Sequence, residues 1–133
     1  MAGTVDALGS GVTGVEIGDP VFGPAVYRGT SAGAADQAVL NLWFPRPAGL
    51  GPVEAAALPM AVETAYRGLA ALGAVSGKTV LVSGAGTTIG FAAAQIAVRL
   101  GARVITSAGK TYADRLREAG PRSSRTAKAS VSG

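Results

Sequence analysis

The chain has 133 residues, which is enough for one ordinary domain or for parts of two. It contains no cysteine and no histidine, which excludes a thiolate nucleophile, a histidine-based catalytic dyad, disulfides and a zinc site with thiolate or imidazole ligands. The formal net charge is +4, and eight of the twelve basic side chains follow Val98, so the basicity belongs to the C-terminal quarter.

Short β-favouring runs separated by glycines extend from Thr4 to about Leu42. They predict short antiparallel strands, too few for a complete barrel. The pair Gly18-Asp19 before Pro20 indicates a tight turn that feeds a strand. The positions expected to be buried in these strands are Val12, Val15, Ile17, Val21, Phe22, Val39 and Leu40.

A connector rich in proline and glycine, residues 45–52, precedes two predicted helices. The first covers residues 54–58 and stops near Pro59, because proline lacks the amide proton that an interior helical position needs. The second covers residues 61–72. Its apolar side chains near one face are Ala61, Ala65, Leu69 and Leu72.

The next segment predicts a strand, turn, helix and strand in that order. Residues 79–82 form an apolar run typical of a parallel strand buried on both faces. A glycine-rich segment follows at once, and then an alanine-rich helix that runs to Leu100. Residues 103–106 predict a second strand, which makes a βαβ unit of about thirty residues.

Residues 79–98 carry no charge, so a membrane span has to be considered. The stretch changes midway from β-branched to alanine-rich and contains polar side chains and glycines, so we expect no span. The N-terminus has no basic segment followed by an apolar one. We therefore predict no secretory signal, and the cytoplasm is the expected compartment.

The glycine-rich segment after the first strand is the strongest chemical signal. A helix N-terminus leaves amide groups unpaired and carries partial positive charge, so it can accept a pyrophosphate that approaches closely. Gly84 would form the turn, Gly86 would admit the phosphates and Gly90 would let the helix pack against the strand. The spacing G-x-G-x-x-x-G is one residue longer than the commoner fingerprint. The two interpretations are a nucleotide site and a tight turn that binds nothing.

The end of the second strand can distinguish NAD from NADP. A carboxylate there would bind the ribose 2′-hydroxyl of NAD and repel a 2′-phosphate, and none occurs before Asp114. Ser107 and Lys110, with Arg115 further along, offer hydroxyl and cationic partners for a phosphate, which favours NADP(H). The alternative for Lys110 is an ordinary solvated lysine in a loop.

Residues 121–133 have one sizeable apolar side chain and no helical or strand period, so they predict a disordered basic tail. Arg122, Arg125 and Lys128 have no aromatic residues between them, which favours a solvated tail over a nucleic-acid partner. Asp114 and Glu118 are expected on the charged face of the last helix. With few acidic residues and no dense acidic run, we predict no metal site.

A series of blocks occurs in one order along residues 3–120 and resembles a known family. The blocks are Gly18-Asp19-Pro20-Val21-Phe22-Gly23, Gly33-Ala34-Ala35-Asp36-Gln37-Ala38-Val39, Glu54-Ala55-Ala56-Ala57-Leu58-Pro59, Thr64-Ala65-Tyr66, residues 80–90 and Gly101-Ala102-Arg103-Val104-Ile105. Together they resemble the medium-chain dehydrogenase/reductase superfamily, and specifically its zinc-independent NADPH:quinone oxidoreductase branch. The enoyl reductase domains of polyketide synthases share these blocks.

The resemblance implies an α/β fold, with the start of a Rossmann doubly wound parallel sheet preceded by a partial GroES-like β domain. Residues 1–52 would be the GroES-like part with its connector, and residues 53–120 the partial Rossmann NADP-binding domain. NADPH would lie in the cleft between the two domains and deliver hydride to a quinone or an activated alkene such as an enone. The cofactor-binding residues implied are Thr64 near the nicotinamide, Ser83, Gly84, Ala85, Gly86, Thr87, Thr88, Ile89 and Gly90 at the pyrophosphate, and Ser107 and Lys110 near the adenosine ribose.

No general acid stands out. Thr64 and Tyr66 are the catalytic candidates, and Tyr66 is equally well interpreted as a core or cleft-lining side chain. The family usually has paired glycines where Thr87 and Thr88 stand, so these side chains would either crowd a phosphate or bind it through their hydroxyls.

The resemblance also implies family segments before residue 1 and after residue 120. The composition after Gly120 leads us to expect a truncated gene or a shifted reading frame. One hypothesis is an oxidoreductase, and the other is a non-catalytic cofactor-binding fragment. Unpaired sheet edges predict an oligomer or a partner subunit.

Overall fold

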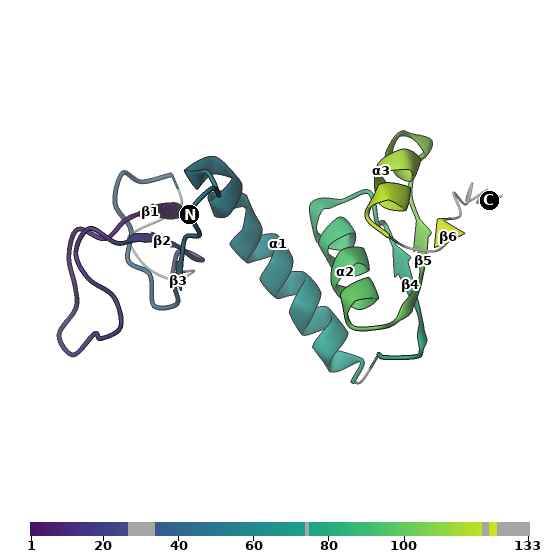
Figure 1. The fold of residues 1–133 in the computed structure, drawn as a ribbon, viewed down its shortest axis with the longest axis horizontal. Helices are drawn as coiled ribbons and strands as arrows, with labels where there is room; N and C mark the ends of the chain where they lie inside the picture. Colours follow the sequence, from purple (N-terminus) through teal and green to yellow (C-terminus); the bar gives the residue numbers. More distant parts are fainter. Residues whose placement is uncertain (27–33, 74, 121–122, 125–133) are drawn as a thin grey trace, which may run out of the picture. The chain divides into compact units, whose positions relative to one another are not determined.

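The computed structural model describes residues 1–26, 34–73, 75–120 and the backbone of residues 123–124. The chain divides into two compact units, Met1–Met60 and Ala61–Gly133, and each contains its own sheet. Figure 1 shows the order of helices and strands, which confirms the predicted α/β class. Apart from residues 123–124, the segment 121–133, predicted to be a disordered tail, lies outside the described residues.

The first unit contains a small antiparallel sheet. Its strands are β1 (Ala2–Thr4), β2 (Pro20–Phe22) and β3 (Phe44–Pro45), in the order β1-β2-β3. The aromatic rings of Phe22 and Phe44 pair across β2 and β3 with their centroids 5.9 Å apart. Gly18 has φ = +98°, so the predicted turn before β2 uses a backbone conformation that favours glycine.

Burial in the first unit differs from the prediction. Of the seven apolar positions expected inside its strands, only Val21 is buried, whereas Ile17 and Val39 are each 67% exposed. The strands are two or three residues long, so most of these apolar side chains lie in connecting segments rather than on the sheet. A sheet this short has too little area to cover them.

A single helix, α1 (Pro52–Ala71), replaces the two helices predicted on either side of Pro59. Proline accepts helical φ and removes only one hydrogen bond, and the flanking alanine, leucine and methionine residues favour the helix strongly enough to continue it. Pro52 occupies the first position, where a missing amide proton costs nothing. Ala61, Ala65 and Leu69 are buried as predicted, but Leu72 lies beyond the helix end and is 64% exposed.

The second unit is built on the predicted βαβ segment. Strands β4 (Thr79–Ser83) and β5 (Arg103–Ser107) pair in parallel, from Thr79 opposite Arg103 to Ser83 opposite Ser107. Helix α2 (Thr88–Arg99) makes the connection between them, and Gly101 follows it with φ = +82°. The unpredicted strand β6 (Ser123–Ser124) pairs in parallel with β5 on its other side.

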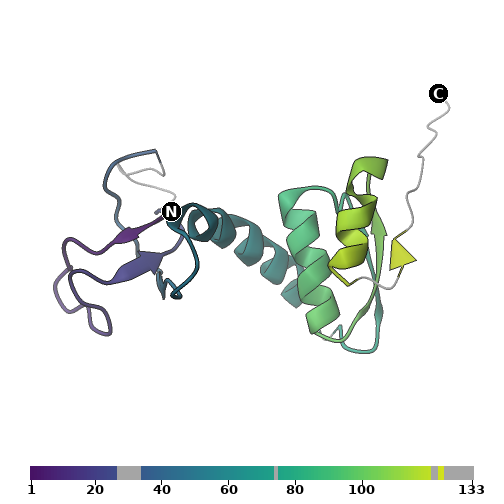
Figure 2. The same ribbon diagram turned by 45° about the horizontal axis from the view of Figure 1, so that its top comes forward.

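One face of this sheet carries the core. Helices α2 and α3 (Ala113–Glu118) both pack on that face, as Figure 2 shows. The buried cluster consists of Leu69, Val75, Val80, Val82, Ala85, Ala94, Ala97, Val104 and Leu116.

The prediction that β4 is buried on both faces is wrong. Val80 and Val82 are buried, but Leu81 between them is 68% exposed. Successive side chains of a strand point to opposite faces, and among the described residues no helix covers the face to which Leu81 points. No helix in the described part of the chain is long and apolar enough to cross a membrane.

Candidate dinucleotide site

The glycine-rich turn joins the end of β4 to the start of α2. Gly84 has φ = +74°, a conformation that a residue with a side chain rarely adopts. A Cβ atom on Gly90 would lie 2.3 Å from the carbonyl oxygen of Gly84 and 2.9 Å from the Cα atom of Ala85. Gly90 therefore allows α2 to pack closely against the turn, and a larger residue there would push the two apart.

The amide groups of this turn fall into two sets. Ala85 donates to the carbonyl of Ser107 over 3.0 Å, Thr87 donates to the carbonyl of Gly84 over 3.0 Å, and Gly90 donates to the Thr87 hydroxyl over 3.1 Å. The amides of Gly86, Thr88 and Ile89 donate to no described residue. These three donors stand at the N-terminus of α2, where the helix dipole favours an anion.

Thr87 is the N-cap of α2. Its hydroxyl accepts from the Gly90 amide and donates to the Gly84 carbonyl over 2.9 Å, so its hydrogen-bonding capacity is used within the turn. Thr88 is the first residue of α2 and is exposed. Of the two expected threonine hydroxyls, only that of Thr88 is therefore unengaged by the turn.

Ser83 and Ser107 are the last residues of β4 and β5. They lie side by side at the carboxyl end of the sheet, because they are partners in the β4–β5 register. Ser107 also accepts the Ala85 amide, which joins the end of β5 to the glycine turn. Lys110 begins the short 3-10 helix η1 (Lys110–Tyr112) just after β5 and is exposed. Ligands of open parallel sheets bind at the carboxyl ends of the strands, which is where these residues lie.

Two charged side chains after β5 are already engaged. The guanidinium of Arg115 lies over the ring of Phe91 on α2, 5.0 Å from the ring centroid. Asp114 pairs with Arg117 on α3, at the exposed face predicted for it. Arg115 therefore joins α3 to α2 in this structure. The sequence analysis had proposed it as a partner for a phosphate and did not indicate this packing role.

Tyr112 contacts the glycine turn at Gly86, and the sequence analysis did not predict this contact. A Cβ atom built on Gly86 would lie 2.7 Å from Cδ2 of Tyr112, 3.1 Å from Cγ and 3.2 Å from Cε2. The Tyr112 ring is therefore packed directly on Gly86. These residues are 26 positions apart, and only the pairing of β4 with β5 brings them together.

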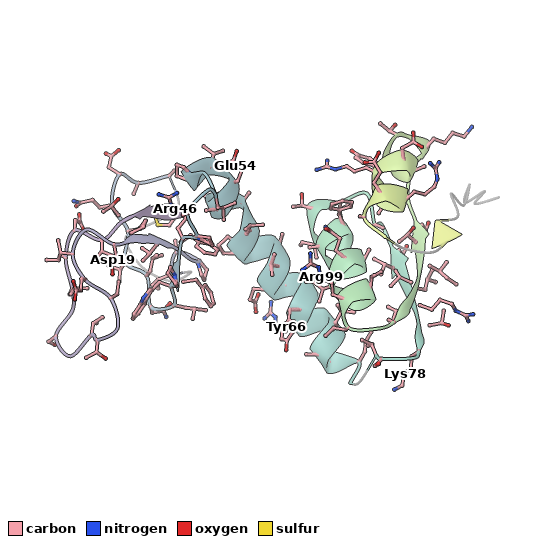
Figure 3. All side chains as sticks on the ribbon, viewed as in Figure 1. Asp19, Arg46, Glu54, Tyr66, Lys78 and Arg99 are labelled. Carbon is pink, nitrogen blue, oxygen red and sulfur yellow. The ribbon has the colours of Figure 1, made fainter. Side chains whose placement is uncertain are left out.

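The two catalytic candidates lie on α1. Tyr66 is 58% exposed and lines an open hollow of about 300 Å³ together with Ser76 and Leu100. Ser76 precedes β4 and Leu100 follows α2, so this hollow is at the amino end of the sheet, opposite the glycine turn. Figure 3 labels Tyr66 on α1 and Lys78 just before β4. Thr64 is half-buried, and its hydroxyl forms no hydrogen bond with the described residues of the turn.

Metal-binding side chains do not gather in the described residues: no group of three or more histidine, cysteine, aspartate or glutamate residues comes within reach of one ion. The candidate site consists instead of the amides of the turn, a serine on each strand end and an exposed lysine.

A scan of the chain against protein-family models found no match. Curated proteins that are similar in sequence include a polyketide synthase subunit and a reductase. One subunit of a phenolphthiocerol/phthiocerol polyketide synthase from Mycobacterium tuberculosis is 40% identical over 110 residues, which is 80% of this chain and 5% of that protein. A 2-methylene-furan-3-one reductase from Solanum lycopersicum is 36% identical over 107 residues, which is 73% of this chain and 27% of the reductase.

Solved structures show the same relationship. An alcohol dehydrogenase superfamily protein from Novosphingobium aromaticivorans matches with a TM-score of 0.84 and 35% identity, over 94% of this chain and 39% of that one. The CurK enoyl reductase matches with a TM-score of 0.77 and 28% identity, over 94% and 37%. The relatives of this chain in sequence and in structure are proteins of the medium-chain dehydrogenase/reductase superfamily.

A quinone oxidoreductase from Thermus thermophilus, solved also in complex with NADPH, is a third match, with a TM-score of 0.59, 36% identity and coverage of 63% of this chain and 28% of that one. These medium-chain dehydrogenase/reductase relatives confirm the predicted fold, the beginning of a Rossmann sheet after part of a GroES-like β domain. The chain spans less than half the length of each of these relatives.

Proposed function

We propose that this chain carries the cofactor-binding turn of an NADPH-dependent oxidoreductase, one that transfers hydride to an activated alkene or a quinone. When bound, NADPH supplies the hydride, and the protein orients and shields it. The free amides of Gly86, Thr88 and Ile89 would bind the pyrophosphate. Ser107 and Lys110 would lie toward the adenosine ribose.

One observation carries this proposal: three unpaired amides stand at the N-terminus of α2, at the carboxyl end of a parallel sheet. Such donors are how helix N-termini bind phosphate groups. In the alternative interpretation, a tight turn that binds nothing, these three amides donate to water, as at other helix N-termini. The similarity to a reductase, an enoyl reductase and a quinone oxidoreductase supports an oxidoreductase, and it favours the activated alkene as strongly as the quinone.

The preference for NADP(H) over NAD(H) is supported by charge. No carboxylate lies at the end of β5, and Asp114 is paired with Arg117 on α3. A 2′-phosphate would therefore meet Ser107 and Lys110 without a competing negative charge. The zinc-independent branch of the superfamily agrees with the absence of cysteine and histidine from the sequence.

A second candidate is a non-catalytic protein that binds the cofactor without turnover. It is favoured by the position of Tyr66, which lies at the end of the sheet opposite the glycine turn. A proton donor has to lie within hydrogen-bond reach of the substrate, and the hollow beside Tyr66 is lined by no residue of the turn.

Titration with NADPH and with NADH, followed by oxidation assays with a small quinone and with an enone, separates these candidates. The proposal predicts that NADPH binds more tightly than NADH and is oxidised in the presence of one acceptor. Binding without oxidation favours the non-catalytic protein. Folded protein that binds neither coenzyme would contradict both.

We also propose that an oligomer or a partner subunit covers the exposed face and edge of the β4–β5 sheet, since Leu81 is 68% exposed there. A cytoplasmic location stays a prediction.

A further inference from the structure

Tyr112 occupies a position with a specific meaning for dinucleotide binding. In the glycine-rich turn of Rossmann folds, the second glycine is required because a side chain there would fill the space that the pyrophosphate needs. In this chain the corresponding glycine is Gly86. The direction in which its side chain would project leads straight to the ring of Tyr112, with three ring atoms at 2.7, 3.1 and 3.2 Å.

The contact is confined to one glycine of the turn. A Cβ atom on Gly84 would meet nothing within 4 Å, and one on Gly90 would meet backbone atoms of the turn itself. Tyr112 thus covers the place where close approach of a phosphate matters most. An aromatic ring and a charged diphosphate cannot occupy that space together.

The ring of Tyr112 is only partly covered by the rest of the protein. Tyr112 is 44% exposed and ends the three-residue helix η1, and its hydroxyl forms no hydrogen bond with a described residue. Rotation about its side-chain bonds into solvent would therefore uncover Gly86 without disturbing the backbone. The amide of Gly86, which donates to no described residue, would then be open to a ligand.

We propose that Tyr112 is a gate over the glycine turn: its ring covers Gly86 in the free chain and must swing away before the diphosphate of a nicotinamide dinucleotide can bind. This inference rests on the proposed function. It makes Tyr112 a residue that sets affinity, because a ligand binds more weakly by the fraction of molecules in which the site is open. A chain that is open in about a tenth of molecules would bind about tenfold more weakly than one without the ring.

Calorimetric titration of the 133-residue chain with NADPH tests the gate through three variants. Tyr112→Ala removes the ring and should lower the dissociation constant, by about tenfold for an open fraction of about a tenth. Tyr112→Phe keeps the ring and should bind within about twofold of the unsubstituted chain. Leu100→Ala is the matched control, since Leu100 is 43% exposed but lies at the opposite end of the sheet. It should also bind within about twofold.

The possible results distinguish failure of the gate from failure of the proposed function. An equal or larger dissociation constant for Tyr112→Ala, with NADPH bound by the unsubstituted chain, overturns the gate and leaves the proposed function standing. No binding by any of the four proteins, each folded, overturns the proposed function and the gate with it. Binding of NADPH by Tyr112→Ala and by none of the other three proteins supports both the gate and the proposed function.

Proton NMR of the unsubstituted chain is a second measurement, which holds even if Tyr112→Ala does not fold. The ring of Tyr112 should show cross-peaks to the Hα protons of Gly86 in the free protein, and saturation with NADPH should abolish them. Cross-peaks that survive at saturation would overturn the gate.

Discussion

Two glycines in helices of this chain, Gly90 and Gly68, differ in whether the fold needs the side chain to be missing. Gly90 is in contact with the backbone of the turn, and a Cβ atom there would lie 2.3 Å from an oxygen that cannot move aside. Gly68, in the last turn of α1, has open space around its missing side chain. The first glycine is needed for packing, and the second only weakens a helix.

We expect Gly90→Ala to lower the free energy of unfolding by about 2 kcal/mol, in the range for overpacking of a filled site. The same substitution at Gly68 should raise it by about 0.5 to 1 kcal/mol, because alanine favours the helix. Urea denaturation followed by circular dichroism measures both. Equal effects of the two substitutions would contradict the packing role of Gly90.

Thr106 has a buried hydroxyl group without a hydrogen-bond partner among the described residues. It lies in β5 with 1% of its surface exposed. Thr106→Val keeps the shape and removes the unpaired group, so the free energy of unfolding should rise by about 1 kcal/mol.

The control for this prediction is Thr79→Val. The Thr79 hydroxyl accepts hydrogen bonds from Arg103 over 2.7 and 3.0 Å, so this substitution should bring no gain. A melting temperature that falls in Thr106→Val would show that the hydroxyl has a partner in solution.

At the scale of elements, α2 is the helix on which the candidate site depends. Its N-cap, Thr87, closes the first turn through two hydrogen bonds, and its buried residues are small enough to let it lie close to the sheet. The first turn of this helix and the residue before its N-cap present the three free amides. A loosened first turn would therefore weaken both the fold and the site.

Thr87→Ala should lower the free energy of unfolding by about 1 kcal/mol, the usual effect of losing an N-cap side chain. Thr87→Ser should restore most of that loss, since serine offers the same oxygen. Thr88→Ala removes a hydroxyl from the neighbouring exposed position and should change stability by less than about 0.5 kcal/mol. Thermal unfolding of the three variants measures these changes. A loss of stability in Thr88→Ala as large as that in Thr87→Ala would argue against a capping role for Thr87.

At the scale of the whole molecule, apolar surface is the dominant feature. The β4–β5 sheet is covered on one face only, and β4 leaves one edge without a strand partner among the described residues. Large apolar side chains such as Leu72 and Leu81 are 64% and 68% exposed. An exposed apolar face beside a free strand edge favours association.

We expect the chain to self-associate with increasing concentration in sedimentation experiments, and Leu81→Lys to shift it toward the monomer. Stability should change by less than about 0.5 kcal/mol, because the side chain is on the surface. Leu72→Lys, equally exposed but outside the sheet, should leave association unchanged. An identical effect of the two substitutions would contradict a role for the sheet face.

Local patterns in the sequence determined a large part of this architecture. The β-branched run at residues 79–82, the glycines after it and the alanine-rich helix predicted the βαβ unit, because strand, turn and helix each depend on neighbouring residues. The boundary at Gly101 followed in the same way. Cofactor preference also came from local residues at the end of β5, Ser107 and Lys110, although that preference remains a proposal.

Only the tertiary structure decided how these elements are covered and what meets across them. Pro59 remained inside α1 because its neighbours compensate for one lost hydrogen bond, and Leu81 became exposed because no described helix lies on its face of the sheet. The contacts of Tyr112 with Gly86 and of Arg115 with Phe91 join residues more than twenty positions apart. Such contacts depend on the register of β4 with β5 and on the seating of α3, neither of which leaves a local pattern in the chain.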